Sequence, residues 1–165
     1  DAGAGGIIAP MIESAKQLKI IRDSMRWPPA GSRGVGFNRA NLFGKHFDSY
    51  IEEAQNPLLI AMIESSHALA NIEDILNVEG IDAILIGPYD LSSSMGMTGQ
   101  FDNLDFLNAI ETIKNKSKVK NVSCGIHIIE PSIESLQERI NEGFNFIAYS
   151  IDGVFLNTYS KNPLK

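Results

Sequence analysis

The chain has 165 residues, of which 44% are hydrophobic and 21% charged, and its formal net charge at pH 7 is −6. These values are typical of a single globular domain, and the scattered basic residues argue against nucleic acid as a main partner. No apolar run approaches the about 20 residues that a membrane-spanning helix needs, so we expect no membrane partner. The single cysteine, Cys124, cannot form an internal disulfide, which favours a reduced, cytoplasmic setting.

Five short apolar runs, rich in β-branched residues, alternate with helical patterns along the chain. The runs are Gly6–Met11, Leu58–Ile63, Ala83–Ile86, Val122–Ile129 and Phe144–Ile151. Most runs are too continuous for strands with one face in water, so we expect strands that are covered on both faces. The alternation predicts parallel βα units, which build either an open doubly wound sheet or part of a barrel.

Helical patterns lie between the apolar runs. They cover Glu13–Met25, Ala68–Leu76, Leu104–Ile113 and Ser132–Ile140. The first has an apolar side made of Ala15, Leu18, Ile21 and Met25. Ser132 is expected to begin the last helix, and Gly143 to follow its end. The longest irregular segment is Trp27–Lys45, and a loop of this length in a compact domain is usually functional or involved in assembly.

Two carboxylates follow neighbouring strands of the predicted sheet. Glu64 comes directly after the second apolar run, and Asp90 comes shortly after the third. If these strands are parallel neighbours, both acids lie at the carboxyl end of the sheet, where ligands bind in open sheets and in barrels. Two oxygen ligands, completed by waters and a chelating substrate, suit Mg²⁺ or Mn²⁺. The alternative is helix capping by Asp90 or by Ser65 and Ser66, and spacing alone leaves both interpretations open.

The other polar candidates carry weaker signals. Arg33, in the stretch R-G-V-G, could bring a guanidinium and backbone amides to an anionic group, but a structural role in a tight glycine loop is favoured. His46, His67 and His127 have no Ser, Cys or acidic partner at the spacing of a nucleophilic triad. His127 lies within a strand and could face the ligand-binding end, although a structural, hydrogen-bonded role is favoured. Cys124 is expected to be a small core residue.

A set of ordered motifs connects these features to a known family. The stretches are G-A-G-G-I-I-A-P-M-I, W-P-P-A-G-S-R-G-V-G-F-N-R-A-N, I-A-M-I-E-S, G-I-D-A-I-L-I-G-P-Y-D-L-S-S-S-M-G and G-F-N-F-I-A-Y-S. In this order they resemble the HpcH/HpaI aldolase family of metal-dependent class II pyruvate aldolases, such as 2-dehydro-3-deoxyglucarate aldolase. The resemblance covers nearly the whole chain, and the ordered set is far more specific than any one motif.

The resemblance implies a fold, a metal and a reaction. The fold is a (β/α)₈ barrel of the phosphoenolpyruvate/pyruvate type, in a homo-oligomer that exchanges a C-terminal helix. Glu64 and Asp90 would bind a divalent metal, Mg²⁺ or Mn²⁺, with Co²⁺ as a further possibility. A 2-oxo acid would chelate this Lewis-acidic metal, and backbone amides near Tyr89 and Asp90 would hold its carboxylate. The implied reaction is the reversible cleavage of 2-keto-3-deoxy sugar acids, or related 2-oxo-4-hydroxy acids, to pyruvate and an aldehyde.

Two positions depart from the family pattern. Met62 stands where many relatives have Gln, two residues before the metal-binding Glu, and it cannot donate a hydrogen bond to a keto oxygen. Tyr89 stands where Ala commonly precedes the second metal ligand, and a ring there narrows or reorients the pocket. Both positions bear on substrate choice. Together with Arg33, they are the candidate substrate-binding residues.

The resemblance also places the chain within a larger barrel. Residues 1–165 would form the C-terminal part, about strands 4 to 8, of a single aldolase domain whose first three strands are lacking here. The catalytic His and Arg of the family lie upstream of this part, so we identify no catalytic residue and expect the 165 residues alone to be inactive.

Two alternative functions remain. One is a metal- and oxo-acid-binding or oligomer-forming module without aldol activity, and the other is a related lyase that acts on a coenzyme A thioester.

Overall fold

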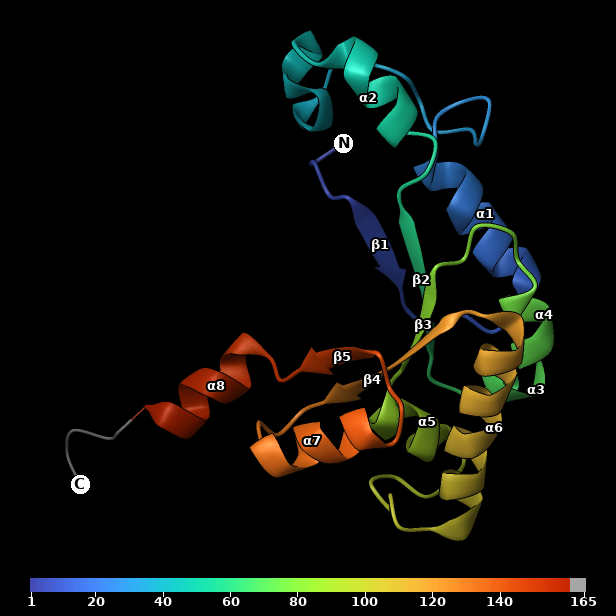
Figure 1. The fold of residues 1–165 in the computed structure, drawn as a ribbon, viewed down its shortest axis with the longest axis vertical. Helices are drawn as coiled ribbons and strands as arrows, with labels where there is room; N and C mark the ends of the chain where they lie inside the picture. The colour runs from blue at the N-terminus through green and yellow to red at the C-terminus, as the bar shows by residue number, and fades with distance from the viewer. Residues whose placement is uncertain (161–165) are drawn as a thin grey trace.

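The structure, a computed structural model, describes residues 1–160. Its centre is one parallel sheet in which each strand pairs with the next along the chain, in the order β1-β2-β3-β4-β5 (Figure 1). The strands are β1 (Gly6–Ala9), β2 (Leu58–Ile63), β3 (Ala83–Ile86), β4 (Ser123–Ile128) and β5 (Phe146–Tyr149). The predicted parallel βα arrangement is confirmed, and the sheet forms a curled half-barrel.

Helices connect the strands. They are α1 (Ala15–Met25), the 3₁₀ segment η1 (Arg39–Gly44), α2 (Phe47–Glu53), α3 (Ser66–Ala70), α4 (Ile72–Leu76), α5 (Pro88–Ser94), α6 (Leu104–Lys120), α7 (Ile133–Asn141) and α8 (Asp152–Tyr159). The expected start of α7 is confirmed, because Ser132 accepts a hydrogen bond from the amide of Ser135. The segment 68–76 is two short helices that meet at Asn71, and α6 continues until Asn121, which adopts a left-handed conformation.

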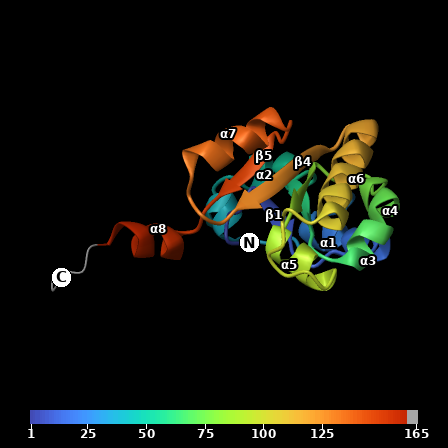
Figure 2. The same cartoon turned by 90° about the horizontal axis from the view of Figure 1, so that it is seen from below.

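The two faces of the sheet differ in how well they are covered. Right-handed crossovers between successive neighbours place the connecting helices on one face, and Figure 2 shows α1, α3, α4 and α6 gathered on one side. Side chains on that face are fully buried, as Leu59, Ile63 and Ile84 illustrate. On the opposite face, Leu58 is 54% exposed and Ile8 is 45% exposed. The expectation of coverage on both faces therefore holds for β3 and is wrong for β1 and β2.

Packing weakens towards the end of the chain. Neither α7 nor α8 contains a buried residue, and β5 is only partly buried. α8 projects away from the sheet in both views (Figures 1 and 2) and exposes apolar side chains such as Leu156 and Tyr159. No helix in the described part of the chain combines the length and apolar character needed to span a bilayer.

Candidate metal and substrate site

Glu64 is a buried carboxylate at the carboxyl end of β2. The following residue, Ser65, caps α3 by accepting a hydrogen bond from the amide of Ala68, so Glu64 takes no part in capping. Glu64 is only 7% exposed, and its Oε2 accepts a 2.8 Å hydrogen bond from the amide of Met11. Met11 has a φ of 52°, which is uncommon for a residue with a side chain. The turn after β1 is thus held in a strained conformation that directs an amide at this carboxylate.

Gly87 provides the space for the Glu64 side chain. It follows β3 as Glu64 follows β2, and the last residues of these strands are partners in register. A Cβ atom at Gly87 would lie 2.9 Å from Oε1 of Glu64 and 2.9 Å from its Cγ, closer than real Cβ contacts. The backbone of Gly87 is ordinary, with φ −97° and ψ 95°. Glycine is therefore required here for room rather than for backbone freedom.

The charge of Glu64 has no cationic partner within residues 1–160. The ion pairs in this part of the chain involve other acids, chiefly on the helices. Burying an unpaired carboxylate is costly, so buried charges are normally paired or coordinate a metal. A carboxylate that is buried, anchored by one amide and lacking a cation fits a divalent metal ligand. Residues 1–160 contain no cluster of three His, Cys, Asp or Glu side chains that could hold an ion, so waters and substrate would complete the coordination.

Asp90 stands in the first turn of α5, at the same end of the sheet as Glu64. The N-cap of this helix is Gly87 and Pro88 is its first residue, so the interpretation of Asp90 as an N-cap is wrong. The carboxylate of Asp90 is exposed and makes no hydrogen bond within the described residues. The structure confirms that β2 and β3 are parallel neighbours. The role of Glu64 and Asp90 as metal ligands stays a prediction.

The candidate substrate-binding residues fall into two places. Met62 lies two residues before Glu64 and thus on the same face of β2, where it is partly buried. Tyr89 is 45% exposed, next to Asp90, and its ring packs edge-on against Phe101 at 5.0 Å. Both lie near the two carboxylates in the chain and in the fold.

Arg33 lies at the opposite end of the sheet. Its Nη2 donates a 2.9 Å hydrogen bond to the hydroxyl of Tyr50, and its guanidinium lies 5.5 Å from the centre of the Trp27 ring. The amide of Trp27 donates to the carbonyl of Ala54, just after α2, and Figure 1 shows α2 beyond the amino ends of β1 and β2. The structure does not bring Arg33 to Glu64. It favours the structural alternative, with aromatic rings as partners in place of an acid.

The histidines and the cysteine provide no nucleophilic site. His67 is 81% exposed at its side chain and lies 3.8 Å from Oε1 of Glu13, and His46 immediately precedes α2. Burial raises the pKa of the Cys124 thiol to about 11, so it is protonated at neutral pH. Cys124 packs against the core, as predicted. His127, in β4, has its Nε2 3.4 Å from the carbonyl oxygen of Ser150.

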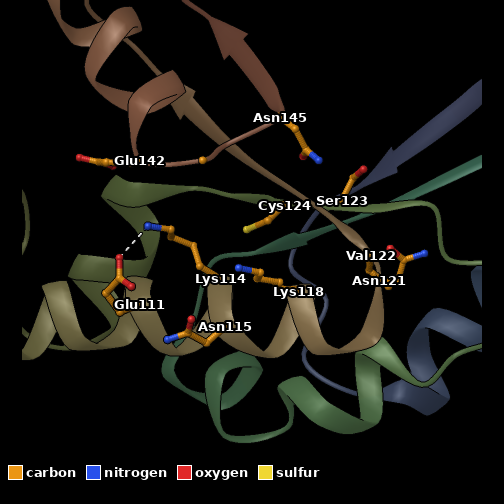
Figure 3. Close-up of a pocket in the computed structure, with 11 residues that line it drawn as sticks. Glu111, Lys114, Asn115, Lys118, Asn121, Val122, Ser123, Cys124, Glu142 and Asn145 are labelled. Atoms are coloured by element: carbon orange, nitrogen blue, oxygen red, sulfur yellow. Dashed lines mark hydrogen bonds and ion pairs between the residues drawn. The ribbon is translucent and has the colours of Figure 1, made fainter.

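Two cavities lie against β4, and neither is lined by Glu64 or Asp90. The larger, of about 480 Å³, is near the amino end of β4 and is shown in Figure 3. There Cys124 points towards the lysines of α6, whereas Ser123 points away from that helix. The second, of about 400 Å³, is lined by residues of α6, α7 and β4, with His127 among them, together with Tyr89. Both lie between α6 and the segment 135–145.

Comparison with known proteins decides the family. Residues 1–158 match the sequence profile of the HpcH/HpaI aldolase/citrate lyase family. The chain belongs to this family. It is 34% identical over 155 residues to a 2-keto-3-deoxy-L-rhamnonate aldolase of Klebsiella pneumoniae, an alignment that covers 92% of this chain and 57% of that protein.

Solved structures of the HpcH/HpaI family share the fold. A family protein from Burkholderia cenocepacia superposes with a TM-score of 0.87 at 28% identity, over 94% of this chain and 62% of that one. An aldolase of the same family from Desulfitobacterium hafniense gives a TM-score of 0.83 at 26% identity, over 95% of this chain and 61% of that one. The chain thus spans less than two thirds of the length of these family members.

Proposed function

We propose that this chain contributes to a metal-dependent aldolase. The enzyme would reversibly cleave 2-keto-3-deoxy sugar acids, or related 2-oxo-4-hydroxy acids, to pyruvate and an aldehyde. Membership of the HpcH/HpaI family and the similarity to a 2-keto-3-deoxy-L-rhamnonate aldolase support the reaction class. The observation that carries the proposal is the buried Glu64 carboxylate, which has an amide partner and a space at Gly87 but no cation in the part of the chain that the structure describes.

The residues of this chain would hold and orient the reacting groups. Glu64 and Asp90 would bind Mg²⁺ or Mn²⁺, with Co²⁺ as a further possibility, and the bound cation supplies Lewis-acid polarisation of the 2-oxo group. The hydrogen bond from the amide of Met11 fixes one oxygen of Glu64 and leaves the other beside Gly87. We expect Met62 to offer the substrate an apolar contact, and the amides of Tyr89 and Asp90 to hold the 2-oxo acid carboxylate.

We place these residues within a (β/α)₈ barrel of the phosphoenolpyruvate/pyruvate type, as about strands 4 to 8. Five consecutive parallel strands and the partial coverage of the family structures support this placement. We also propose a homo-oligomer in which α8 packs on a neighbouring subunit. This proposal is supported by the position of α8, which projects from the sheet (Figure 2). Its side chains Leu156 and Tyr159 are 70% and 69% exposed. A cytoplasmic location stays a prediction.

The test is the exchange of the methyl protons of pyruvate in deuterated water, followed by NMR with the natural, full-length polypeptide. We expect exchange that requires Mg²⁺, Mn²⁺ or Co²⁺ and stops when the metal is chelated. No exchange with any of these metals would contradict the proposal. The unusual residues Met62 and Tyr89 are the reason to test the alternative of a binding module without aldol activity. This alternative predicts saturable pyruvate binding that is lost in Glu64→Ala, with no proton exchange in either protein.

A further inference from the structure

His127 stands in the same row across the sheet as Glu64 and Gly87. The preceding row consists of three isoleucines that are partners in register, Ile63, Ile86 and Ile126. Those isoleucines are buried against the helices in the core. Because side chains alternate along a strand, the next residue of each strand faces the opposite way, away from the helices. Glu64 and His127 therefore point to the same open face of the sheet, on strands either side of Gly87.

The spacing of this row leaves room for a small molecule. Neighbouring strands lie about 4.8 Å apart, so Glu64 and His127, two strands apart, are separated by about 10 Å at the backbone. Gly87 has no side chain, and the Glu64 side chain lies over it, with Cγ and Oε1 each 2.9 Å from where a Cβ atom would stand. A three-carbon 2-oxo acid bound at this carboxylate would lie between Glu64 and His127, and the group beyond it would reach His127.

Ser150 adds a second polar group beside His127. It follows β5, and its amide donates a 2.6 Å hydrogen bond to the carbonyl of Ile128, which continues the ladder at the carboxyl end of the sheet. Its own carbonyl lies 3.4 Å from Nε2 of His127. Ser150 is 8% exposed, and its hydroxyl has no hydrogen-bond partner within residues 1–160. Leaving a buried hydroxyl without a hydrogen bond is costly, so a partner from outside the described residues would stabilise this group.

The backbone of Ser150 carries a further cost. Its φ is 61°, in the left-handed region that favours glycine. A glycine would avoid both the strain and the unsatisfied hydroxyl, yet the chain has serine at this position. Strained, unsatisfied residues concentrate where a ligand is bound, and this one lies at the end of the sheet that holds Glu64.

We propose that His127 and Ser150 bind a hydroxyl group on the aldehyde half of the substrate. The inference rests on the proposed aldolase function, in which the pyruvate half is held at Glu64 and Asp90. An imidazole and a hydroxyl can each donate and accept a hydrogen bond, so together they match a hydroxylated chain and not a plain hydrocarbon one. His127 and Ser150 are positioning residues that favour hydroxylated aldehydes, and neither takes part in breaking the carbon–carbon bond.

The experiment compares two aldehydes of equal length in the full-length enzyme with Mg²⁺. Pyruvate is added to glyceraldehyde, which carries hydroxyls, or to propionaldehyde, which does not. We expect His127→Leu and Ser150→Gly each to lower kcat/KM for glyceraldehyde about 10- to 100-fold while changing that for propionaldehyde less than about twofold. Ser123→Ala is the matched control, because Ser123 is on the same strand and side as His127 but at the amino end, and it should change neither value.

The outcomes separate the subsite from the reaction. An equal loss with both aldehydes would mean that the two residues are merely structural, and no loss with either would mean that they do not meet the substrate. Both results overturn the subsite. If His127→Leu does not fold, the Ser150→Gly variant still tests the subsite, because glycine readily adopts a φ of 61° and this variant should fold. Pyruvate proton exchange needs no aldehyde, so its absence from the wild-type enzyme would contradict the aldolase function itself.

Discussion

The two ends of the sheet bury opposite charges in different ways. At the amino end, the guanidinium of Arg33 lies 5.5 Å from the centre of the Trp27 ring and 5.7 Å from that of Tyr50, and Arg26 donates to the carbonyl of Gly80. The buried groups without partners there are N–H donors, on Arg26, Trp27 and Arg33. At the carboxyl end, Glu64 accepts one hydrogen bond, from the amide of Met11, and has no cationic partner among residues 1–160. A delocalised cation can rest on aromatic faces and carbonyls, whereas a buried carboxylate needs a positive charge.

If Glu64 binds the proposed metal, the amino end contributes stability and the carboxyl end contributes function. The same division holds for barrels in general, where binding groups follow the carboxyl ends of the strands. It makes an experimental distinction possible. Substitutions at the amino end should lower the free energy of unfolding and leave ligand binding intact, and substitutions at the carboxyl end should do the reverse.

The largest expected effect is that of Glu64→Gln. Removing the charge of a metal ligand should reduce metal-dependent pyruvate proton exchange by about 10³-fold or more, on the scale of losing a principal catalytic interaction. The metal-free protein should be no less stable, because the buried charge has no cation to lose. Exchange is followed by NMR and stability by urea unfolding in the presence of a chelator. A clear loss of stability with exchange intact would reverse the assignment of the two ends.

The second prediction concerns the amino end. Trp27 is 2% exposed and contacts the rings of Phe47 and Tyr50. Trp27→Ala should lower the free energy of unfolding by about 3–5 kcal/mol, as expected for a large buried aromatic, and leave the Mn²⁺ affinity of the folded protein unchanged. Phe37→Ala is the matched control, since Phe37 also contacts the ring of Phe47 but is 72% exposed, and it should cost clearly less than Trp27→Ala. A loss of Mn²⁺ affinity in folded Trp27→Ala would link the two ends.

The third prediction tests the space beside Glu64. Gly87→Ala would place a methyl group 2.9 Å from Oε1 of Glu64, while its φ of −97° suits alanine. We expect Mn²⁺ affinity, measured by calorimetry, to fall about 10- to 100-fold, the usual loss when the support of a metal ligand is disturbed. In Gly34→Ala the added methyl group meets nothing within 4 Å, so affinity should stay the same. Unchanged affinity in Gly87→Ala would show that the carboxylate does not need this space.

Sequence patterns predicted the sheet better than its surroundings. The runs Leu58–Ile63 and Ala83–Ile86 match β2 and β3 residue for residue, because Glu64 and Gly87 end the apolar pattern where the hydrogen-bonded ladder ends. The run at β1 was predicted two residues too long. Apolar residues continue to Met11, but the chain leaves the ladder after Ala9 and Met11 turns into the left-handed region. Hydrophobicity alone does not distinguish a strand residue from an apolar turn residue, and Met11 is 51% exposed.

Short helices and long-range placement were harder to predict. α2, α5 and α8 have seven or eight residues each, too few to show a helical period, although Pro88 at the first position of α5 was a usable signal. Arg33 was assigned to the substrate because a glycine-rich loop gives no indication of which end of the sheet it lies at. The row that joins Glu64 to His127 follows from alternation only once the register of β2, β3 and β4 is known.

The smallest expected effect is that of removing a surface ion pair. This pair shows how much a solvent-exposed charge contributes to stability, for comparison with the buried charges at the two ends of the sheet. Glu73 on α4 pairs with Lys116 on α6, and this hydrogen bond and charge lower the pKa of Glu73 below its ordinary value of 4.5. A lowered pKa in the folded state means stabilisation that is present above the unfolded pKa and is lost as pH falls through the folded value. Exposed pairs of this kind contribute little.

Glu73→Gln should therefore shift the melting temperature by no more than about 1 °C at pH 7, and the shift should shrink as the pH falls through the lowered pKa of Glu73. Glu79→Gln removes an equal charge from an exposed residue that forms no ion pair with any other described residue, and calorimetric scans of both variants isolate the contribution of the pair. A shift at pH 7 as large as that of Trp27→Ala would mean that this helix contact, and not the aromatic cluster at the amino end, dominates stability. The main contribution to stability would then come from contacts between helices, and not from the amino end of the sheet.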